Sequence, residues 1–378
     1  MIELIYFDNA ATTFPKPNAV INAVINTARR RCGNPGRGGH ALARAADAEV
    51  YRCRKAIKEF FNAPSTDSVV FTNNTTAALN TCIFGLINSG DRVITTDYEH
   101  NSVRRPLHRL NGVTVRKAKV DFDSADATLA EFKKMLADGA EWLVVSHASN
   151  VCGKTIPLRE ICVAAHMAGT RVIVDAAQSA GYLKINVDAD KIDYLCAPGH
   201  KGLYGPQGTG FIIINGAAPK PLLVGGTGSN SLSPDQPDYT PDALESGTLN
   251  VPAISGLREG ISYLNSIGAE NLHKREISLV QRAYRGLESI NGVILYTSAP
   301  SLNDSPVLTF NLKGKTSFEA ARLYDNYGIC LRAGYHCAPD AHAKLGTSEY
   351  GTVRLSVGAF NTAREIDYFL KITQKILK

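Results

Sequence analysis

Short runs of hydrophobic residues alternate with amphipathic stretches over much of the chain. The runs have the length of buried strands, and the stretches between them have the periodicity of helices. Buried strands that alternate with helices predict a mainly parallel sheet with helices on both faces, and ligands of such a sheet bind at the carboxyl ends of its strands. The expected strands lie at 68–72, 91–96, 112–118, 141–149, 170–177, 192–197 and 208–215.

The pattern changes after residue 215. Residues 216–241 are dense in Gly, Pro, Ser and Asn, and this segment is too long for a routine connection, so we expect a functional loop that also marks a boundary. The remainder has the pattern of a smaller α+β domain. Its expected helices lie at 251–267, 270–289, 317–327 and 363–377, and its expected strands include 307–312 and 352–357.

Composition narrows the class of protein. A chain of 378 residues with 44% hydrophobic and 20% charged residues is long enough for one large and one smaller core. The net charge of +6 is spread along the chain without a basic stripe, so we expect no nucleic-acid partner. No segment approaches the roughly 20 apolar residues of a membrane span, and the first residues do not resemble a secretion signal, so we expect a cytoplasmic protein. The eight cysteines have no metal-ligand spacing, which argues for reduced thiols and no metal.

A lysine and an aspartate are expected at one edge of the sheet. Lys201 lies between two runs that we expect to end at the same edge, and Asp175 lies near the end of another run. A lysine between glycines is often only a solvated loop residue, but a buried carboxylate without a partner costs several kcal/mol. Such a pair is what pyridoxal phosphate requires, because the amine forms a Schiff base and the carboxylate pairs with the ring nitrogen.

Two further segments fit an anionic aromatic ligand. Asn74, Thr75 and Thr76 follow an expected strand and open a helix, which offers backbone N–H groups and hydroxyls to a phosphate. The same residues also suit an ordinary helix cap. His100 follows the next strand, and taken alone it is equally typical of a surface or capping histidine.

A set of motifs resembles a known family. In this order along nearly the whole chain they are "YFDNAATTFPKP", "NNTTAALN", "YEHNSV", "SHASNVCGKTIPL", "VIVDAAQSAGY", "GHKGLYGPQGTGFI", "ESGTLNVPAISGL" and "RAGYHCA" with "GTVRLSVGAFNT". They resemble the cysteine desulfurases among the class V, fold-type I pyridoxal-phosphate enzymes, in the branch with a short loop after the catalytic cysteine that also includes selenocysteine lyases. The resemblance implies an α/β fold of type I, with a mainly parallel seven-stranded sheet and a smaller α+β C-terminal domain.

The resemblance also implies roles around pyridoxal 5'-phosphate. Lys201 would form the Schiff base, His100 would stack on the ring and assist proton transfer, and Asp175 would pair with the pyridine nitrogen. The remaining cofactor contacts would be Gln178 to the phenolic oxygen, Thr75, Thr76 and His200 to the phosphate, and Asn150 beside the ring and substrate.

A neighbouring subunit is implied as well. Thr248, and with it the glycine loop at 225–228, would reach the phosphate site of the partner in a homodimer, which gives the long Gly and Pro segment a purpose. One position departs from the family. Pro198 stands where a Ser or Thr hydroxyl commonly contacts phosphate, and proline supplies neither a hydroxyl nor an N–H.

Cys337 aligns with the cysteine that takes sulfur from the substrate as a persulfide. A nearby His336, His100 or helix end is expected to favour the thiolate that attacks. Cys330 lies in an expected strand and is interpreted as an inert core thiol. The resemblance assigns Arg354 to the substrate carboxylate, which suits the bidentate fork of arginine.

Two further substrate contacts have structural alternatives. Arg332 matches a substrate contact in the family, with a structural salt bridge as an equal alternative. Asn9 is a candidate for the substrate entrance, although an Asx turn explains it equally well.

The expected activity is conversion of L-cysteine into L-alanine, with the sulfur passed through Cys337 to a sulfur-acceptor protein. We expect an N-terminal arm at 1–15 that packs with the small domain, a large cofactor domain at 16–250 and a small domain at 251–378 that carries the cysteine loop. The alternatives are a selenocysteine lyase, a class V aminotransferase without sulfur chemistry, and a cofactor-binding scaffold without turnover. A comparison of rates with cysteine and selenocysteine would identify a selenocysteine lyase. Formation of a keto acid would identify an aminotransferase, and absence of a cofactor absorbance band would identify a scaffold.

Overall fold

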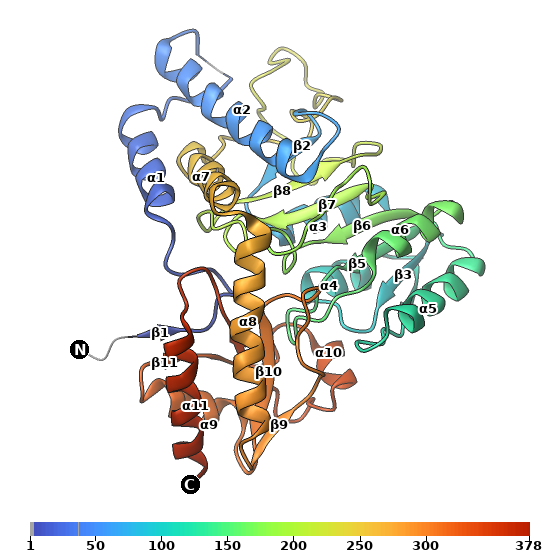
Figure 1. Ribbon diagram of the computed structural model, residues 1–378. Coiled ribbons are helices and arrows are strands. Elements are labelled where there is room, and N and C mark those ends of the chain that lie inside the picture. The colour runs from blue at the N-terminus through green and yellow to red at the C-terminus, as the bar shows by residue number, and fades with distance from the viewer. Residues whose placement is uncertain (1–3, 37) are drawn as a thin grey trace.

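A seven-stranded sheet forms the centre of the larger unit of the molecule (Figure 1). The computed structural model describes residues 4–36 and 38–378. The strands lie across the sheet in the order β2, β8, β7, β6, β5, β3 and β4. Each hydrophobic run that was expected to be a strand contains one: β2 Val69–Thr72, β3 Arg92–Thr96, β4 Thr114–Ala118, β5 Trp142–Ser146, β6 Arg171–Asp175, β7 Tyr194–Pro198 and β8 Gly210–Ile214.

The sheet is mainly parallel, as predicted, with one reversed strand. Strand β8 runs antiparallel to both of its neighbours, β2 and β7, whereas β4, β3, β5, β6 and β7 pair in parallel. The expectation that the strands on either side of Lys201 end at the same edge was therefore wrong. Strand β7 ends there and β8 begins there, so the connection that carries Lys201 still lies at the edge where Asp175 ends β6.

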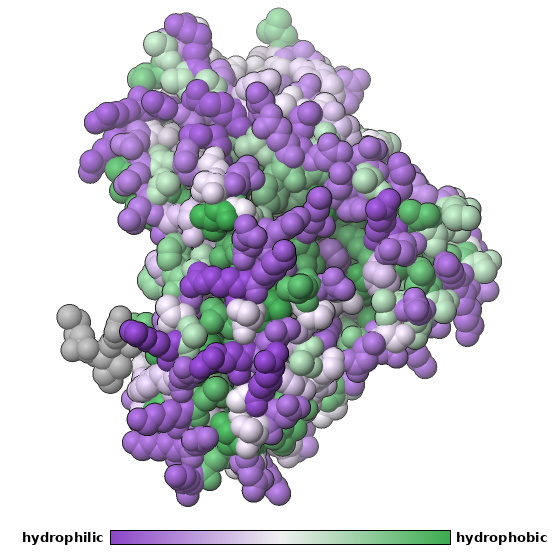
Figure 2. Space-filling model, in the orientation of Figure 1, coloured by the Kyte–Doolittle hydropathy of each residue, from purple (hydrophilic) through white to green (hydrophobic). Residues whose placement is uncertain are grey.

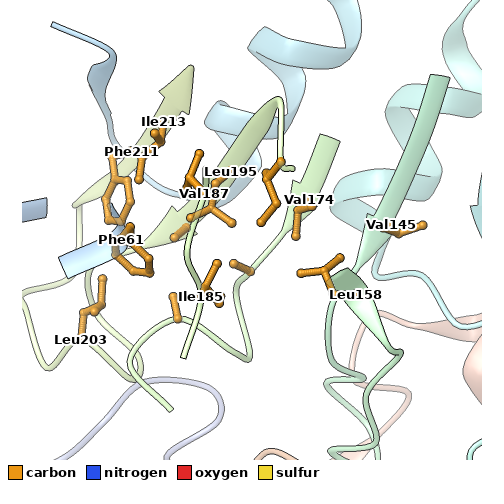
Figure 3. Close-up of a cluster of buried hydrophobic side chains, with 14 of the residues drawn as sticks. Phe61, Val145, Leu158, Val174, Ile185, Val187, Leu195, Leu203, Phe211 and Ile213 are labelled. Carbon is orange, nitrogen blue, oxygen red and sulfur yellow. The ribbon is translucent and has the colours of Figure 1, made fainter. Parts of the chain in front are cut away.

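Helices cover both faces of this sheet because its strands are hydrophobic on both sides. Leu143 and Val145 of β5 join one core, and Trp142 and Val144 of the same strand join the other. Figure 3 shows part of the first core, where Phe61 packs against Phe211. The helices of the larger unit are α1 Asn18–Arg30, α2 Ala41–Phe61, α3 Thr75–Leu86, α4 Asn101–Arg109, α5 Ala125–Ala137, α6 Leu158–Met167 and α7 Val251–Ile267.

A smaller α+β unit follows, with a core of its own. Its sheet is antiparallel in the order β12, β13, β10, β9, and capping boxes at Thr316 and Thr362 begin two of its helices. Its strands are β9 Val293–Leu295, β10 Val307–Leu312, β12 Arg332–Gly334 and β13 Thr352–Ser356. Its helices are α8 Ala269–Glu288, α9 Ser317–Asp325, α10 Pro339–Lys344 and α11 Ala363–Leu377.

The N-terminal segment joins the smaller unit. Strand β1 (Ile5–Tyr6) pairs in parallel with β11 (Ile329–Cys330), and Phe7 is buried in the smaller core. Helix α7, in contrast, contributes its buried side chains to a core of the larger unit. We therefore propose that the boundary between the units lies near Gly268 instead of at residue 250.

The outer surface is largely polar. On the face seen in Figure 2, hydrophilic residues cover most of the molecule and hydrophobic residues gather toward its middle. Within residues 4–36 and 38–378, every helix is too short or too polar to cross a membrane.

A buried ion pair joins the two units and provides a test of the packing. Lys154 donates to Asp304 at 3.1 Å, with only 5% and 7% of the two side chains exposed. We expect Asp304→Ala to lower the free energy of unfolding by about 3–5 kcal/mol, because it leaves a buried ammonium without a counter-charge. Urea unfolding measures the change.

A second variant and a surface control show whether the loss of stability comes from the unpaired buried charge. The double variant Lys154→Met with Asp304→Leu removes both charges and is expected to lose much less stability. Asp367→Ala breaks an exposed ion pair with Arg282 and is expected to change little. Equal losses for the single and double variants of the buried pair would contradict this interpretation.

Candidate active site

A cavity lies at the carboxyl ends of the parallel strands, where the fold class predicts a ligand. It is lined by the segments that follow β3, β5, β6 and β7, and by the first turn of α3. Of the residues predicted from the sequence, the cavity brings together Thr75, Thr76, His100, Asn150, Asp175, Gln178, His200 and Lys201. Its other lining residues are Asn74, Tyr98, Ser102, Ser146, Ala148, Ala177 and Pro198.

Lys201 and Asp175 face the same cavity. Burial lowers the pKa of Lys201 to about 8, and the cations Arg354 and Arg332 act in the same direction, while Asp175 opposes the shift. Burial raises the pKa of Asp175, although its carboxylate accepts a hydrogen bond from the backbone N–H of Ala177 at 2.8 Å. The pair is a reactive amine beside a carboxylate that is 3% exposed.

The first turn of α3 offers donors to the same cavity. The Asn74 side chain accepts from the N–H of Ala77 and caps the helix, which leaves Thr75 and Thr76 at the positive end of the helix dipole. The buried Thr75 Oγ1 and His200 Nδ1 have no hydrogen-bond partner within the described residues. Both atoms are therefore free to bind an anionic group.

His100 and His200 are neutral near pH 7. Burial lowers the pKa of each imidazole to about 4, and the nearby Lys201 adds to the effect in both cases. His336 is buried as well, and its pKa lies well below the usual range for histidine. Burial thus disfavours a positive charge on both rings. That His336, His100 or a helix end favours the thiolate of Cys337 stays a prediction.

The loop with Cys337 lies against this cavity. The carbonyl of Cys337 accepts from the N–H of Asn101 at 2.7 Å, and the carbonyl of His336 accepts from Asn150 Nδ2 at 2.6 Å. His336 and Cys337 have φ angles of 46° and 57°, which cost roughly 1–3 kcal/mol each for residues other than glycine. The two hydrogen bonds help to hold this strained turn, and the Cys337 side chain is exposed.

Arg354 is buried on β13 beside the same loop. Its Nη1 donates to the carbonyl of Asn150 at 2.8 Å, and its Nη2 donates to Asp8 at 2.8 Å. Its Nε has no partner within the described residues. Arg332 lies directly opposite on β12, and it forms no ion pair in the part of the chain that the structure describes, so the salt-bridge alternative for Arg332 has no support.

Asn9 does not lie at a substrate entrance, and that prediction is corrected. Its side chain is 1% exposed; Nδ2 donates to the carbonyl of Ser356 and to Asn361, and Oδ1 accepts from the N–H of Phe14. These bonds tie the N-terminal segment to the end of β13. Asn9 is a structural residue, but its Oδ1 accepts from Phe14, five residues on, which is not the bond of the Asx turn that was the alternative.

Thr248 lies outside the cavity and is exposed, so its role toward a partner subunit stays a prediction. Cys330 is partly buried on β11, and burial raises the pKa of its thiol. Pro198 lines the cavity, where its ring contributes no hydrogen-bond donor to a bound phosphate.

Sequence reasoning missed several lining residues. Ser102 and Ser146 are both buried in the wall of the cavity. Each had a signal in the sequence, since Ser102 stands two positions after His100 and Ser146 ends an expected strand. A carboxylate next to Ser146 was also missed: Glu99 accepts from Ser146 Oγ at 2.6 Å, and burial raises the pKa of Glu99 to about 7.

Comparisons with known proteins place this geometry in a family. The family model for class-V aminotransferases matches residues 5–369. A probable cysteine desulfurase from Methanothermobacter thermautotrophicus is 33% identical over 384 residues, which cover 98% of this chain and 94% of the relative. A probable cysteine desulfurase from Pyrococcus abyssi is 33% identical over 389 residues, covering 100% and 95%. The apo structure of cysteine desulfurase from Thermococcus onnurineus NA1 superposes with a TM-score of 0.92 at 32% identity, covering 99% of this chain and 94% of that one. The chain therefore belongs to the class-V aminotransferase family.

Proposed function

We propose that this protein is a pyridoxal-phosphate-dependent cysteine desulfurase that converts L-cysteine into L-alanine and takes the sulfur onto Cys337. One observation carries the proposal. The loop of an exposed cysteine is hydrogen-bonded to Asn101 and Asn150, at the rim of the cavity that contains Lys201 and Asp175. The names of the similar proteins from Methanothermobacter and Pyrococcus support the same activity.

The residues of the cavity fit pyridoxal 5'-phosphate. Lys201 would tether its aldehyde carbon, and Asp175 would pair with its ring nitrogen. The unpartnered Thr75 Oγ1 and His200 Nδ1 would bind its phosphate, together with Thr76. Gln178 Nε2 donates one hydrogen to the carbonyl of Ala10 at 3.0 Å, and its second hydrogen would go to the phenolic oxygen. When bound, the cofactor withdraws electrons from the α-carbon of an amino acid and so weakens the bond to its β-substituent.

The side chains of this protein then divide the remaining work. With a pKa of about 8, Lys201 is partly neutral near pH 7 and can accept the α-proton of the substrate. The thiolate of Cys337 attacks the sulfur of the substrate, so a Cys337–sulfur bond forms as the carbon–sulfur bond breaks. The substrate carbon takes up a proton, and the products are L-alanine and a persulfide on Cys337. A sulfur-acceptor protein would then remove the terminal sulfur.

Exposed hydrophobic residues support the proposed homodimer. Large apolar side chains are exposed on α1, on α2 and in the segment 216–241, at one end of the molecule (Figure 1). They are Ile21, Ile25, Leu42, Tyr51, Leu222, Leu223, Val224 and Leu232. Thr248 is exposed as well, and so is free to contact a second copy of the chain.

Arg354 is the proposed partner of the substrate carboxylate. Its Nε is unpaired, and the remaining hydrogens of its fork permit a bidentate contact. We expect Arg354→Lys to raise the KM for L-cysteine about 10- to 100-fold, because an ammonium cannot reproduce two parallel hydrogen bonds. Steady-state kinetics measures this, with the cofactor absorbance as the check on folding.

Arg332→Lys is the matched control for Arg354→Lys, since Arg332 lies directly opposite on the neighbouring strand. If only Arg354 binds the carboxylate, the control changes KM far less. An unchanged KM for Arg354→Lys would remove Arg354 from the substrate site.

Product analysis tests the proposed function against its alternatives. Incubation of the cofactor-loaded protein with L-cysteine is expected to give L-alanine and sulfide in the presence of a thiol reductant. Formation of a keto acid in place of alanine would favour an aminotransferase, and turnover restricted to L-selenocysteine would favour a selenocysteine lyase. Absence of a cofactor absorbance band would favour a scaffold without turnover.

A further inference from the structure

A buried serine stands between two side chains of the candidate active site. Ser102 Oγ lies 2.7 Å from His100 Nδ1 and 3.5 Å from Asp175 Oδ2. Ser102 is 7% exposed, and its hydroxyl faces the cavity region between the two groups. The contacts form one continuous line from the imidazole through the hydroxyl to the carboxylate.

We propose that Ser102 is a positioning residue that couples the protonation of His100 to the carboxylate of Asp175. This inference rests on the proposed function, in which His100 stacks on the cofactor ring and Asp175 pairs with the ring nitrogen. Ser102 is a positioning residue because it acts through these two side chains.

The hydrogen-bond pattern fixes the resting arrangement. The backbone N–H of Ser102 donates to His100 Nδ1 at 3.1 Å, so Nδ1 carries no proton and the neutral ring carries its proton on Nε2. In this state the Ser102 hydroxyl is free to point at Nδ1 or at Asp175. Within the described residues, Ser102 supplies all of the hydrogen bonds made by the His100 ring.

The arrangement changes when the neutral His100 ring, which carries its proton on Nε2, receives a second proton at Nδ1. A ring with N–H groups on both nitrogens donates from Nδ1 to Ser102 Oγ, and the hydroxyl then donates to Asp175. The proton stays on the imidazole and no bond to carbon or oxygen breaks. The backbone N–H of Ser102 loses its acceptor, which is tolerated in the first turn of a helix.

The charges around His100 make its connection to Asp175 through Ser102 relevant to its protonation. Lys201, Arg332, Arg354 and Arg105 are all near enough to disfavour a positive imidazole. Asp175 is the negative group at the end of the line of contacts, and Ser102 connects it to the ring. Within the described residues, this hydroxyl is the hydrogen-bonded link between the His100 ring and the carboxylate of Asp175.

If the Ser102 side chain had only a structural role in helix α4, Ser102→Ala would change neither the cofactor absorbance nor the rate. His100 already caps α4 through the backbone N–H of Ser102, and that bond does not need the Ser102 side chain. Alanine is the best helix former, so Ser102→Ala keeps the cap and the helix. The variant removes the coupling hydroxyl and little else.

The test uses the cofactor-loaded protein and the variants Ser102→Ala and Ser102→Thr, with Ser266→Ala, an exposed helix position outside the cavity, as the control. Two quantities are followed against pH: the absorbance of the bound cofactor without substrate, and the rate of alanine formation from L-cysteine. Neither readout is expected to change in the control.

We expect Ser102→Ala to move the midpoint of the cofactor absorbance to higher pH by roughly half a unit to one unit, the size of one lost hydrogen bond. The reason is that Asp175, which then keeps only the hydrogen bond from the N–H of Ala177, would hold the positive charge of the cofactor more strongly. We expect kcat to fall about 5- to 10-fold and Ser102→Thr to restore both values, because threonine supplies the same hydroxyl. If Ser102→Ala leaves the midpoint and the rate unchanged, the inference is wrong. It is also wrong if Ser102→Thr shows the same shifted midpoint and lowered rate as Ser102→Ala. Both outcomes leave the proposed function intact. A wild-type protein without cofactor absorbance would overturn the proposed function and this inference with it.

Discussion

Cys337→Ala is expected to reduce the rate of L-alanine formation from L-cysteine by about 10³-fold or more while leaving the cofactor absorbance intact. The size follows from the loss of the attacking atom, because removal of a nucleophile removes the reaction path and not only a contact. The fold is expected to tolerate the change. The Cys337 side chain is exposed, and the two hydrogen bonds that hold its loop are made by the backbone carbonyls of His336 and Cys337.

Cys330→Ala is the matched control for Cys337→Ala. Cys330 is the neighbouring thiol along the chain, it is partly buried on β11, and burial raises its pKa. We expect this variant to keep most of the activity. A rate that survives in Cys337→Ala and is lost in Cys330→Ala would reverse the assignment of the two thiols.

Lys201→Arg is the second change with a very large expected effect. A guanidinium keeps a positive charge opposite Asp175, so the cavity keeps its charge balance, but it neither forms a Schiff base nor accepts a proton near neutral pH. We expect the absorbance of covalently bound cofactor to disappear and kcat to fall by about 10⁴-fold or more. Spectroscopy after reconstitution and a product assay measure the two effects.

A lysine outside the active site provides the comparison. Lys184 lies away from the cavity, so Lys184→Arg is expected to keep both absorbance and activity. Retention of a Schiff-base absorbance in Lys201→Arg would mean that another amine holds the cofactor. The pKa of Lys201, about 8 as a result of burial, is the structural reason to expect that Lys201 is the reactive amine.

The sheet was predictable because its strands are buried on both faces. Each hydrophobic run corresponds to one strand, from β2 to β8. The helices expected after residue 250 also form, although the first of them, α7, packs in the larger unit. The direction of β8 was missed because a hydrophobic run does not encode its direction. A signal existed in the connection between β7 and β8, since residues 199–209 form no helix and a parallel crossover normally needs one.

The composition of the cavity was also largely predictable. Residues that end parallel strands meet at one edge, which brought Lys201 and Asp175 together as expected. The charge of His100 and His336 was not predictable, because it depends on burial that arises only in the folded chain. The burial of Asn9 was missed for the same reason, because two of its partners, Ser356 and Asn361, are close to it in space but far away in the sequence.

The central claim is that sulfur moves from free cysteine to Cys337 in a cavity built around Lys201. Mass spectrometry of the cofactor-loaded protein after one equivalent of L-cysteine, without reductant, tests it most directly. We expect one additional sulfur atom on the peptide that contains Cys337, together with one equivalent of L-alanine. Alanine without sulfur on that peptide, or sulfur on a different cysteine, would contradict the account.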